Sequence, residues 1–252
     1  MAVKKLREGK RIIGTMVRMV KNPAIALVAK DAGLDFIMID MEHGTYSVES
    51  VSAIANVARS IGLGIFVRVP ELSKGYVSGI MDGGADGVMV PMLSTKQQAQ
   101  GLVNWSRYAP IGNRGLGTPG AHTNFGAMGE KPESFMARQN EITLAIAQIE
   151  TKEAIENIEE IAAVPGIDVL LIGPNDLSNA LGVPGELMSD MLQQAIGKVA
   201  DAAQKHGKVF AIHSGDALLD IWESRGMQMV MNNLEINILS AGFSAITEKY
   251  RK

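Results

Sequence analysis

A single (β/α)8 barrel is the fold that the sequence predicts, with an extra helical segment at the C-terminal end. The chain has 252 residues, which suits one barrel domain. Short apolar runs alternate with helical patterns along its whole length, and the composition shows no break that would separate two domains. Eight such runs, apolar on both faces and separated by crossover helices, indicate a parallel sheet that closes on itself.

The expected strands are rich in β-branched and other apolar residues. They are Ile12–Val17, Phe36–Asp40, Gly64–Val69, Gly87–Pro91, Thr143–Glu150, Asp168–Gly173, Val209–His213 and Met229–Asn232.

Segments with helical spacing separate most of these strands. They are Pro23–Ala32, Val48–Ser60, Thr95–Tyr108, Lys152–Ala163, Asp190–His206 and Asp216–Ser224, and Leu234–Tyr250 adds one or two helices after the last strand. Such an added segment often packs on a neighbouring subunit, so we expect a homo-oligomer.

One region departs from this rhythm, the glycine- and proline-rich stretch Pro110–Asn140. Two interpretations are open. If the stretch is a long connection that follows a strand, it lies over the active-site mouth; the alternative is a flexible surface excursion without a role in the site. His122 within it would then reach the mouth or be solvated.

Composition excludes several classes of function. The net charge is −3 and there is no basic block, so no nucleic-acid partner is expected. The absence of cysteine excludes a disulfide scaffold and a thiolate nucleophile, and it suits a reducing cytoplasm. No stretch has the length and hydropathy of a membrane span, and the N-terminal residues have no signal-peptide pattern.

Polar residues gather where the predicted strands end, which is where barrel enzymes carry their active sites. The set comprises Asp40, Glu42, His43, Arg68, Gln148, Glu150, Gly173–Asp176 and His213. Charges at buried strand ends need compensation, so their convergence favours a ligand or a metal ion.

Glu150 and Asp176 are the candidate metal ligands. Gln148 and Glu150 are two residues apart on a strand, so both side chains face the barrel lumen. Two carboxylates without cysteine or a histidine cluster suit a hard divalent cation, Mg²⁺ or Mn²⁺, with Co²⁺ or Zn²⁺ as alternatives. Capping and ion-pair roles are the competing interpretations for these two carboxylates.

Arg68 and His43 are the candidate groups for binding and proton transfer. The guanidinium of Arg68 suits bidentate recognition of a carboxylate, although an ion pair with Asp40 or Glu42 would also explain it. His43, at a junction between strand and loop, can act as a general base near neutral pH. His213 fits a core role better. No lysine lies within a strand, which disfavours a Schiff-base mechanism.

Taken together, five segments resemble the HpcH/HpaI aldolase family, the metal-dependent pyruvate aldolases. They are Gly33–Gly44, Val67–Pro70, Gly84–Pro91, Ala147–Thr151 and Ile172–Ser178. The resemblance covers nearly the whole chain and implies cleavage of a 4-hydroxy-2-oxo acid, of the 2-keto-3-deoxy sugar acid or 4-hydroxy-2-oxoheptanedioate type, to pyruvate and an aldehyde.

The resemblance also implies a role for each residue. Glu150 and Asp176 ligate the metal ion, Arg68 and Gln148 bind the 2-oxo acid, and Gly173, Pro174, Asn175 and Asp176 line the carboxylate site. His43 serves as the acid/base group and Asp82, at the end of a helical segment, as its orienting partner. Family members assemble as trimers of dimers with an exchanged last helix. An oxo-acid decarboxylase acting on oxaloacetate and a non-catalytic oxo-acid-binding barrel are the alternatives.

Overall fold

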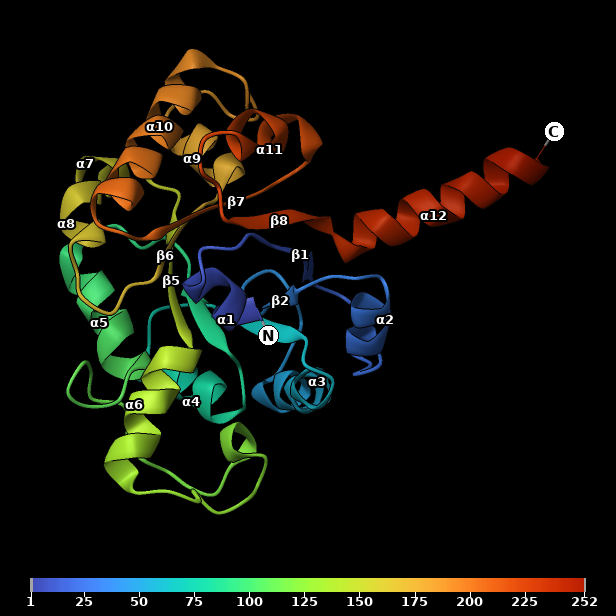
Figure 1. Ribbon diagram of the computed structural model, residues 1–252. Helices are drawn as coiled ribbons and strands as arrows, with labels where there is room; N and C mark the ends of the chain where they lie inside the picture. Colours follow the sequence, from blue (N-terminus) through green and yellow to red (C-terminus); the bar gives the residue numbers. More distant parts are fainter. Residues whose placement is uncertain (1, 252) are drawn as a thin grey trace.

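The computed structural model describes residues 2–251, in which eight parallel strands form a closed barrel in the order β1 to β8 (Figure 1). This confirms the predicted fold class. The strands are β1 (Ile12–Val17), β2 (Phe36–Asp40), β3 (Gly64–Arg68), β4 (Gly87–Val90), β5 (Leu144–Ile149), β6 (Val169–Ile172), β7 (Val209–Ser214) and β8 (Met229–Leu234).

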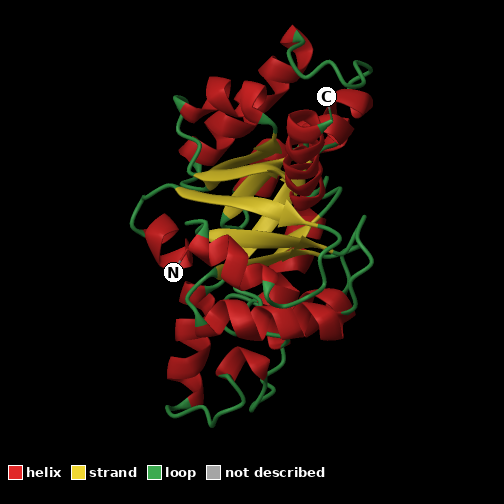
Figure 2. Ribbon diagram, turned by 90° about the vertical axis from the view of Figure 1, so that its right-hand side faces the viewer, coloured by secondary structure: helices red, strands yellow, loops and turns green. Residues whose placement is uncertain are grey.

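Helices surround the barrel on its outside (Figure 2). They are α1 (Ala2–Arg7), α2 (Ile25–Asp31), α3 (Val48–Ser60), α4 (Lys74–Asp82), α5 (Lys96–Ser106), α6 (Pro132–Ile142), α7 (Lys152–Glu156), α8 (Ile158–Ala162), α9 (Pro174–Ala180), α10 (Asp190–Lys205), α11 (Asp216–Glu223) and α12 (Glu235–Tyr250). None of the helices within residues 2–251 is both long and apolar enough to cross a membrane.

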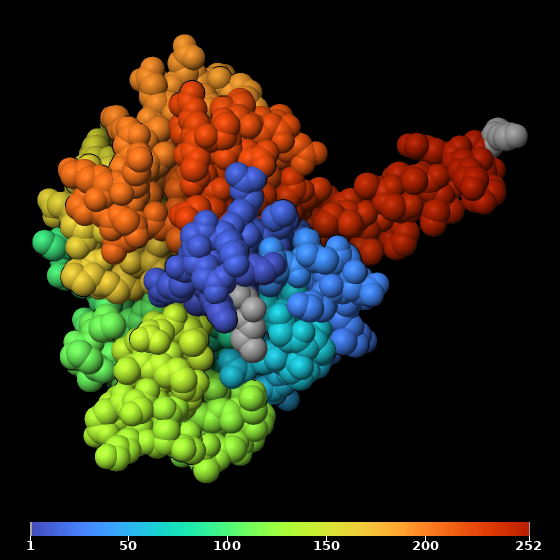
Figure 3. Space-filling model, in the orientation of Figure 1, coloured from blue at the N-terminus to red at the C-terminus, as the bar shows by residue number. Residues whose placement is uncertain are grey.

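Helix α12 extends away from the barrel as a single arm (Figures 1 and 3). Its large apolar side chains are exposed, with Phe243 at 64% and Ile246 at 58% of their full accessibility. Only its first residue, Glu235, is buried. An amphipathic or apolar helix gains most of its stability by packing, so a bare arm of this kind is suited to a contact outside its own barrel.

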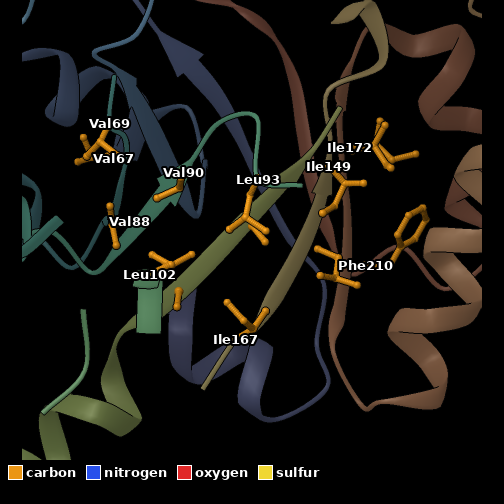
Figure 4. Packing of buried hydrophobic residues seen from close by; sticks show 14 of the residues in the cluster. Val67, Val69, Val88, Val90, Leu93, Leu102, Ile149, Ile167, Ile172 and Phe210 are labelled. Atoms are coloured by element: carbon orange, nitrogen blue, oxygen red, sulfur yellow. The ribbon is translucent and has the colours of Figure 1, made fainter. Parts of the chain in front are cut away.

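Two apolar layers hold the barrel together. The outer layer lies between the strands and the helices, where branched side chains such as Val67, Val88 and Ile149 are fully buried (Figure 4). The inner layer fills the lumen and includes Phe36 and Phe66, whose rings lie 5.1 Å apart.

Glycine makes room for these two rings. A Cβ at Gly14 would lie 2.5 Å from the Phe36 carbonyl oxygen and 2.7 Å from its ring, and one at Gly87 would lie 2.9 Å from the Phe66 ring. The lumen between these strands is therefore a packed core rather than a pore.

The stretch Pro110–Asn140 differs from its predicted position and is partly ordered into a helix. It follows α5 rather than a strand, so it lies at the amino end of the barrel, opposite the mouth, and ends in α6. His122 is buried there at 3% accessibility, and its Nδ1 lies 3.2 Å from the Asp82 carbonyl oxygen. The predictions that this loop covers the mouth, and that His122 reaches it or is solvated, are wrong.

Candidate active site

Buried polar side chains form one connected cluster at the carboxyl-terminal mouth of the barrel. Asp40 ends β2, Arg68 ends β3, and Gln148 and Glu150 lie at the end of β5. Each of the four is at most 4% accessible. They continue the lumen rows of Met38, Phe66 and Ile146, because side chains two residues apart on a strand face the same way.

Arg68 is held by two carboxylates. Its Nε and Nη2 donate to the two oxygens of Asp40 at 2.9 and 2.8 Å, and its Nη1 lies 2.8 Å from Glu42 Oε2. Burial raises the pKa of Asp40, but the hydrogen bonds and charge of Arg68 outweigh this and hold it below its usual value. The ion-pair interpretation of Arg68 is therefore present in the structure, and it does not exclude a role at the mouth.

Glu150 is the carboxylate most constrained by its surroundings. Its Oε1 accepts the backbone N–H of Met92 at 2.7 Å, and its Oε2 accepts Nε2 of Gln148 at 2.5 Å. Burial, the largest cause, raises the pKa of Glu150 to about 7, and the charge of Asp176 adds to the shift while the Met92 N–H opposes it.

Gly173 lies directly against this pair. A Cβ at Gly173 would collide with Glu150 Oε2 and would lie 2.8 Å from Gln148 Nε2. Asp176 is exposed in the first turn of α9, the helix that Gly173 precedes. Gly173, at the start of this segment, thus lies against the end of β5.

The donor set at this end of the mouth fits a hard divalent cation. Its oxygens come from the carboxylates of Glu150 and Asp176, and the buried Oε1 of Gln148 has no hydrogen-bond partner within residues 2–251. No group of three or more His, Cys, Asp or Glu side chains within those residues is arranged for metal binding. Such a sparse set leaves positions for water and substrate oxygens.

His43 lies at the rim. Its side chain is 54% accessible, its Nε2 is 3.9 Å from Glu42 Oε2, and its backbone N–H donates to Asp40 Oδ1 at 3.3 Å. His213 differs, because its Nε2 lies 3.0 Å from the Asn233 carbonyl oxygen and burial lowers its pKa to about 4. This agrees with the core role expected for His213.

Asp82 is not near His43 within this chain. It ends α4, which runs from the mouth toward the amino end of the barrel, and its Oδ1 accepts Nη2 and Nε of Arg114 at 2.6 and 3.1 Å. His43 follows β2 at the opposite end. The prediction that Asp82 orients His43 is therefore wrong for residues of one subunit.

Sequence reasoning missed Arg18 and Glu235. Arg18 follows β1, and its Nε donates to Asp40 Oδ2 at 2.9 Å. Glu235, at the start of α12, accepts the backbone N–H groups of Arg18, Met19 and Val20 through Oε1. An arginine directly after a strand was the available signal for the first, whereas no local pattern marks the second.

A closed parallel barrel with buried polar side chains at its carboxyl-terminal mouth is the arrangement of a (β/α)8 enzyme. The HpcH/HpaI aldolase/citrate lyase family model matches residues 17–220, and the chain belongs to this family. It is a carbon–carbon lyase of the aldolase class.

Similar proteins support the assignment along the whole chain. A 4-hydroxy-4-methyl-2-oxoglutarate aldolase of Chaetomium globosum is 37% identical over 78% of this chain and 73% of its own length. A 4-hydroxy-2-oxovalerate aldolase of Novosphingobium aromaticivorans is 34% identical over 98% and 93%. The crystal structure of an HpcH/HpaI aldolase from Desulfitobacterium hafniense is 30% identical, with a TM-score of 0.94 over 99% and 96% of the two chains.

Proposed function

We propose that this enzyme cleaves a 4-hydroxy-2-oxo acid reversibly to pyruvate and an aldehyde, with a divalent cation held by Glu150 and Asp176. The observation that carries the proposal is the buried, oxygen-lined set at the end of β5, in which Gln148, Glu150 and Gly173 are in mutual contact. The aldolase names of relatives that match most of the chain favour this reaction over decarboxylation or mere binding of an oxo acid.

In the cleavage direction, the C3–C4 bond breaks and its electron pair remains on C3. The C4 hydroxyl loses its proton and becomes the aldehyde carbonyl, and C3 is then protonated to give the methyl group of pyruvate. A bound Mg²⁺ or Mn²⁺ would supply positive charge that stabilises the enolate of the oxo acid.

The protein's own groups have distinct tasks in this scheme. His43, exposed at the rim, takes the proton of the C4 hydroxyl and returns it in the reverse direction. Gln148, with its free Oε1, and Arg68 orient the oxo-acid end, with Pro174 and Asn175 beside it. Asp82 and His43 lie at opposite ends of one barrel, so Asp82 can orient only the His43 of another subunit.

The exposed arm α12 favours a homo-oligomer. Its apolar residues, Phe243 and Ile246 among them, are covered if a second copy receives the helix. A trimer of dimers is the assembly that the family resemblance implies. Sedimentation velocity tests it, since Phe243→Glu is expected to lower the oligomeric state, and an unchanged sedimentation coefficient would contradict this role of α12. A cytoplasmic location, suited to a chain without cysteine, is part of the proposal.

Exchange of pyruvate protons tests the reaction without any knowledge of the aldehyde. The protein is incubated with pyruvate in D2O and Mg²⁺ or Mn²⁺, and the methyl proton signal is followed. We expect loss of the signal, stopped by EDTA. Glu150→Gln is expected to abolish exchange, whereas Glu153→Gln, an exposed carboxylate in α7, serves as the matched control. Absence of exchange with every metal would overturn the proposal.

A further inference from the structure

The mouth contains two arginines that share Asp40, and they differ in how much of their hydrogen-bonding capacity the protein uses. The Arg68 side chain is 5% accessible and directs Nε, Nη1 and Nη2 at Asp40 and Glu42. Arg18 is 28% accessible and uses only Nε, at 2.9 Å from Asp40 Oδ2. Its Nη1 and Nη2 find no acceptor among residues 2–251. Arg18 therefore carries a guanidinium edge that the protein itself does not use.

The backbone of Arg18 is fixed from several sides. Its N–H donates to Glu235 Oε1 at 2.8 Å, as do those of the next two residues, and Glu235 is only 5% accessible. The Arg18 carbonyl oxygen lies close to Gly44, where an added Cβ would be 3.0 Å away. Tyr46 Oη donates to the Val20 carbonyl oxygen at 2.8 Å. A long side chain rooted in so rigid a loop loses less entropy when it binds a ligand.

The position of Arg18 decides which part of a substrate it can meet. β1 is the strand opposite β5 in a closed barrel of eight strands in sequential order. Arg18 therefore lies across the mouth from Glu150, where the oxo-acid end is held under the proposed function. A group at Arg18 must belong to the far end of the substrate.

We propose that Arg18 is a specificity-determining residue that binds a second carboxylate on the aldehyde-derived end, so that the preferred substrate is a 4-hydroxy-2-oxo dicarboxylic acid. This inference rests on the proposed function and specifies its substrate class. Guanidinium and carboxylate match in geometry, and two parallel hydrogen bonds from Nη1 and Nη2 would select a carboxylate over a methyl group. Family membership leaves the class open, because the names of relatives include both a dicarboxylic and a monocarboxylic substrate.

The experiment compares matched acceptors in the aldol direction, with the full-length protein, Mn²⁺ and pyruvate. Two carboxylated aldehydes, glyoxylate and 4-oxobutanoate, are paired with the uncharged acetaldehyde and butanal. The wild-type enzyme is expected to show a higher kcat/KM for at least one carboxylated member than for its uncharged partner. In Arg18→Gln the ratio for that pair should fall by about tenfold or more, since a hydrogen bond to a charged group is lost. Arg18→Lys keeps the positive charge but lacks the two parallel donors of the guanidinium, so it should restore part of the ratio that is lost in Arg18→Gln.

Other outcomes overturn the inference. A wild-type kcat/KM ratio near one for both aldehyde pairs contradicts it. An equal fall of kcat/KM for the carboxylated and the uncharged member of a pair in Arg18→Gln also contradicts it, because Arg18 would then only support Asp40. The pyruvate KM of Arg18→Gln in the proton-exchange assay is a further check. If it rises by as large a factor as the kcat/KM ratio of the aldehydes falls, Arg18 lies at the oxo-acid end and the inference is wrong.

The two proposals fail in different ways. Absence of pyruvate proton exchange in the wild-type enzyme refutes the proposed function, whereas exchange with an unchanged ratio refutes the role of Arg18 alone. Arg225→Gln is the control variant, because Arg225 lies over the Trp222 ring, 4.9 Å from its centre, at the end of α11 away from the mouth.

Discussion

Met92 directs its backbone N–H at Glu150, 2.7 Å from Oε1, while it holds a left-handed conformation with φ of 54°. A residue with a side chain rarely adopts this conformation, and where it does so beside a functional group the strain is part of the site. Its side chain is 52% accessible, so packing of the side chain is not what holds the conformation. The geometry thus fixes one oxygen of Glu150 and leaves the other facing Gln148 and Gly173.

Two substitutions at Met92 separate backbone from side chain. Met92→Gly keeps the left-handed conformation without a steric cost, so affinity for Mn²⁺ should stay within about twofold of wild type. Met92→Val disfavours that conformation through its β-branch and should weaken Mn²⁺ binding about tenfold, as is typical when a hydrogen-bond partner of a metal ligand is displaced. Isothermal titration measures both, and equal affinities would show that the Met92 N–H has no such role.

Glu235 couples the base of α12 to the mouth, and its truncation should reveal this. Glu235→Ala leaves three backbone N–H groups at Arg18–Val20 without their acceptor, and we expect a loss of about 2–3 kcal/mol in the free energy of unfolding. The preference for carboxylated aldehydes should fall with it, because Arg18 loses its fixed position. Urea titration and the aldehyde ratio are the measurements, and a lower stability with an unchanged ratio would separate Glu235 from substrate recognition.

The lowered pKa of His213 predicts how the free energy of unfolding depends on pH. Burial lowers its pKa from 6.5 to about 4 in the folded protein. The unfolded chain therefore binds a proton at His213 before the folded protein does, so this contribution to stability is complete above pH 6.5 and is lost as pH falls toward 4. A shift of this size corresponds to about 3 kcal/mol.

His213→Gln should remove that dependence while keeping a donor for the Asn233 carbonyl oxygen. Its free energy of unfolding should change less between pH 7 and pH 4 than that of the wild type. Urea denaturation at a series of pH values measures the difference, and parallel curves for the two proteins would contradict the assignment.

Strand positions were predictable because the barrel buries both faces of most strands, for example β2 to β6. Ile12–Val17 and Phe36–Asp40 agree with the structure at both ends, and the other six differ by one or two residues at one or both ends. The spacing of Gln148 and Glu150 likewise determines their shared face, and the structure joins them by a hydrogen bond. Local periodicity contains this information.

What the sequence could not supply depends on contacts between distant segments. The loop after Pro110 is an exception: it was placed at the mouth on its glycine and proline content, although the predicted helix Thr95–Tyr108 that precedes it already places it at the amino end of the barrel. Arg18 and Glu235 are 217 residues apart, and only chain closure between β1 and β8 brings them together. Asp82 was assigned by resemblance, which carries no information about which end of the barrel, or which subunit, a residue meets.

The amino end of the barrel depends on Asp168 in a way that separates stability from catalysis. Its carboxylate accepts hydrogen bonds from Arg107, from Arg7 at 2.6 Å and from the backbone N–H of Ala145 at 2.7 Å. Arg107 is 2% accessible, so without this partner a buried guanidinium charge is left uncompensated. Burial already lowers the pKa of Arg107, and the charge of Asp168 opposes that shift. Breaking a buried ion pair from one side costs about 3–5 kcal/mol, so Asp168→Asn should lower the free energy of unfolding by roughly that amount.

The double variant Arg107→Met with Asp168→Leu tests whether charge is the cause. Replacing Arg107 and Asp168 by apolar side chains leaves no buried charge without a partner, because Arg7, which also pairs with Asp168, has a side chain that is 47% exposed, so the double variant should recover much of the stability lost in Asp168→Asn. The Mn²⁺ affinity of the folded protein should stay within about twofold of wild type in both variants, because Glu150 lies at the other end of the strands and is held by separate partners. Urea titration and Mn²⁺ binding are the two measurements. A double variant as unstable as Asp168→Asn would assign the loss to packing rather than charge, and a fall in Mn²⁺ affinity would show that the two ends of the barrel are energetically coupled.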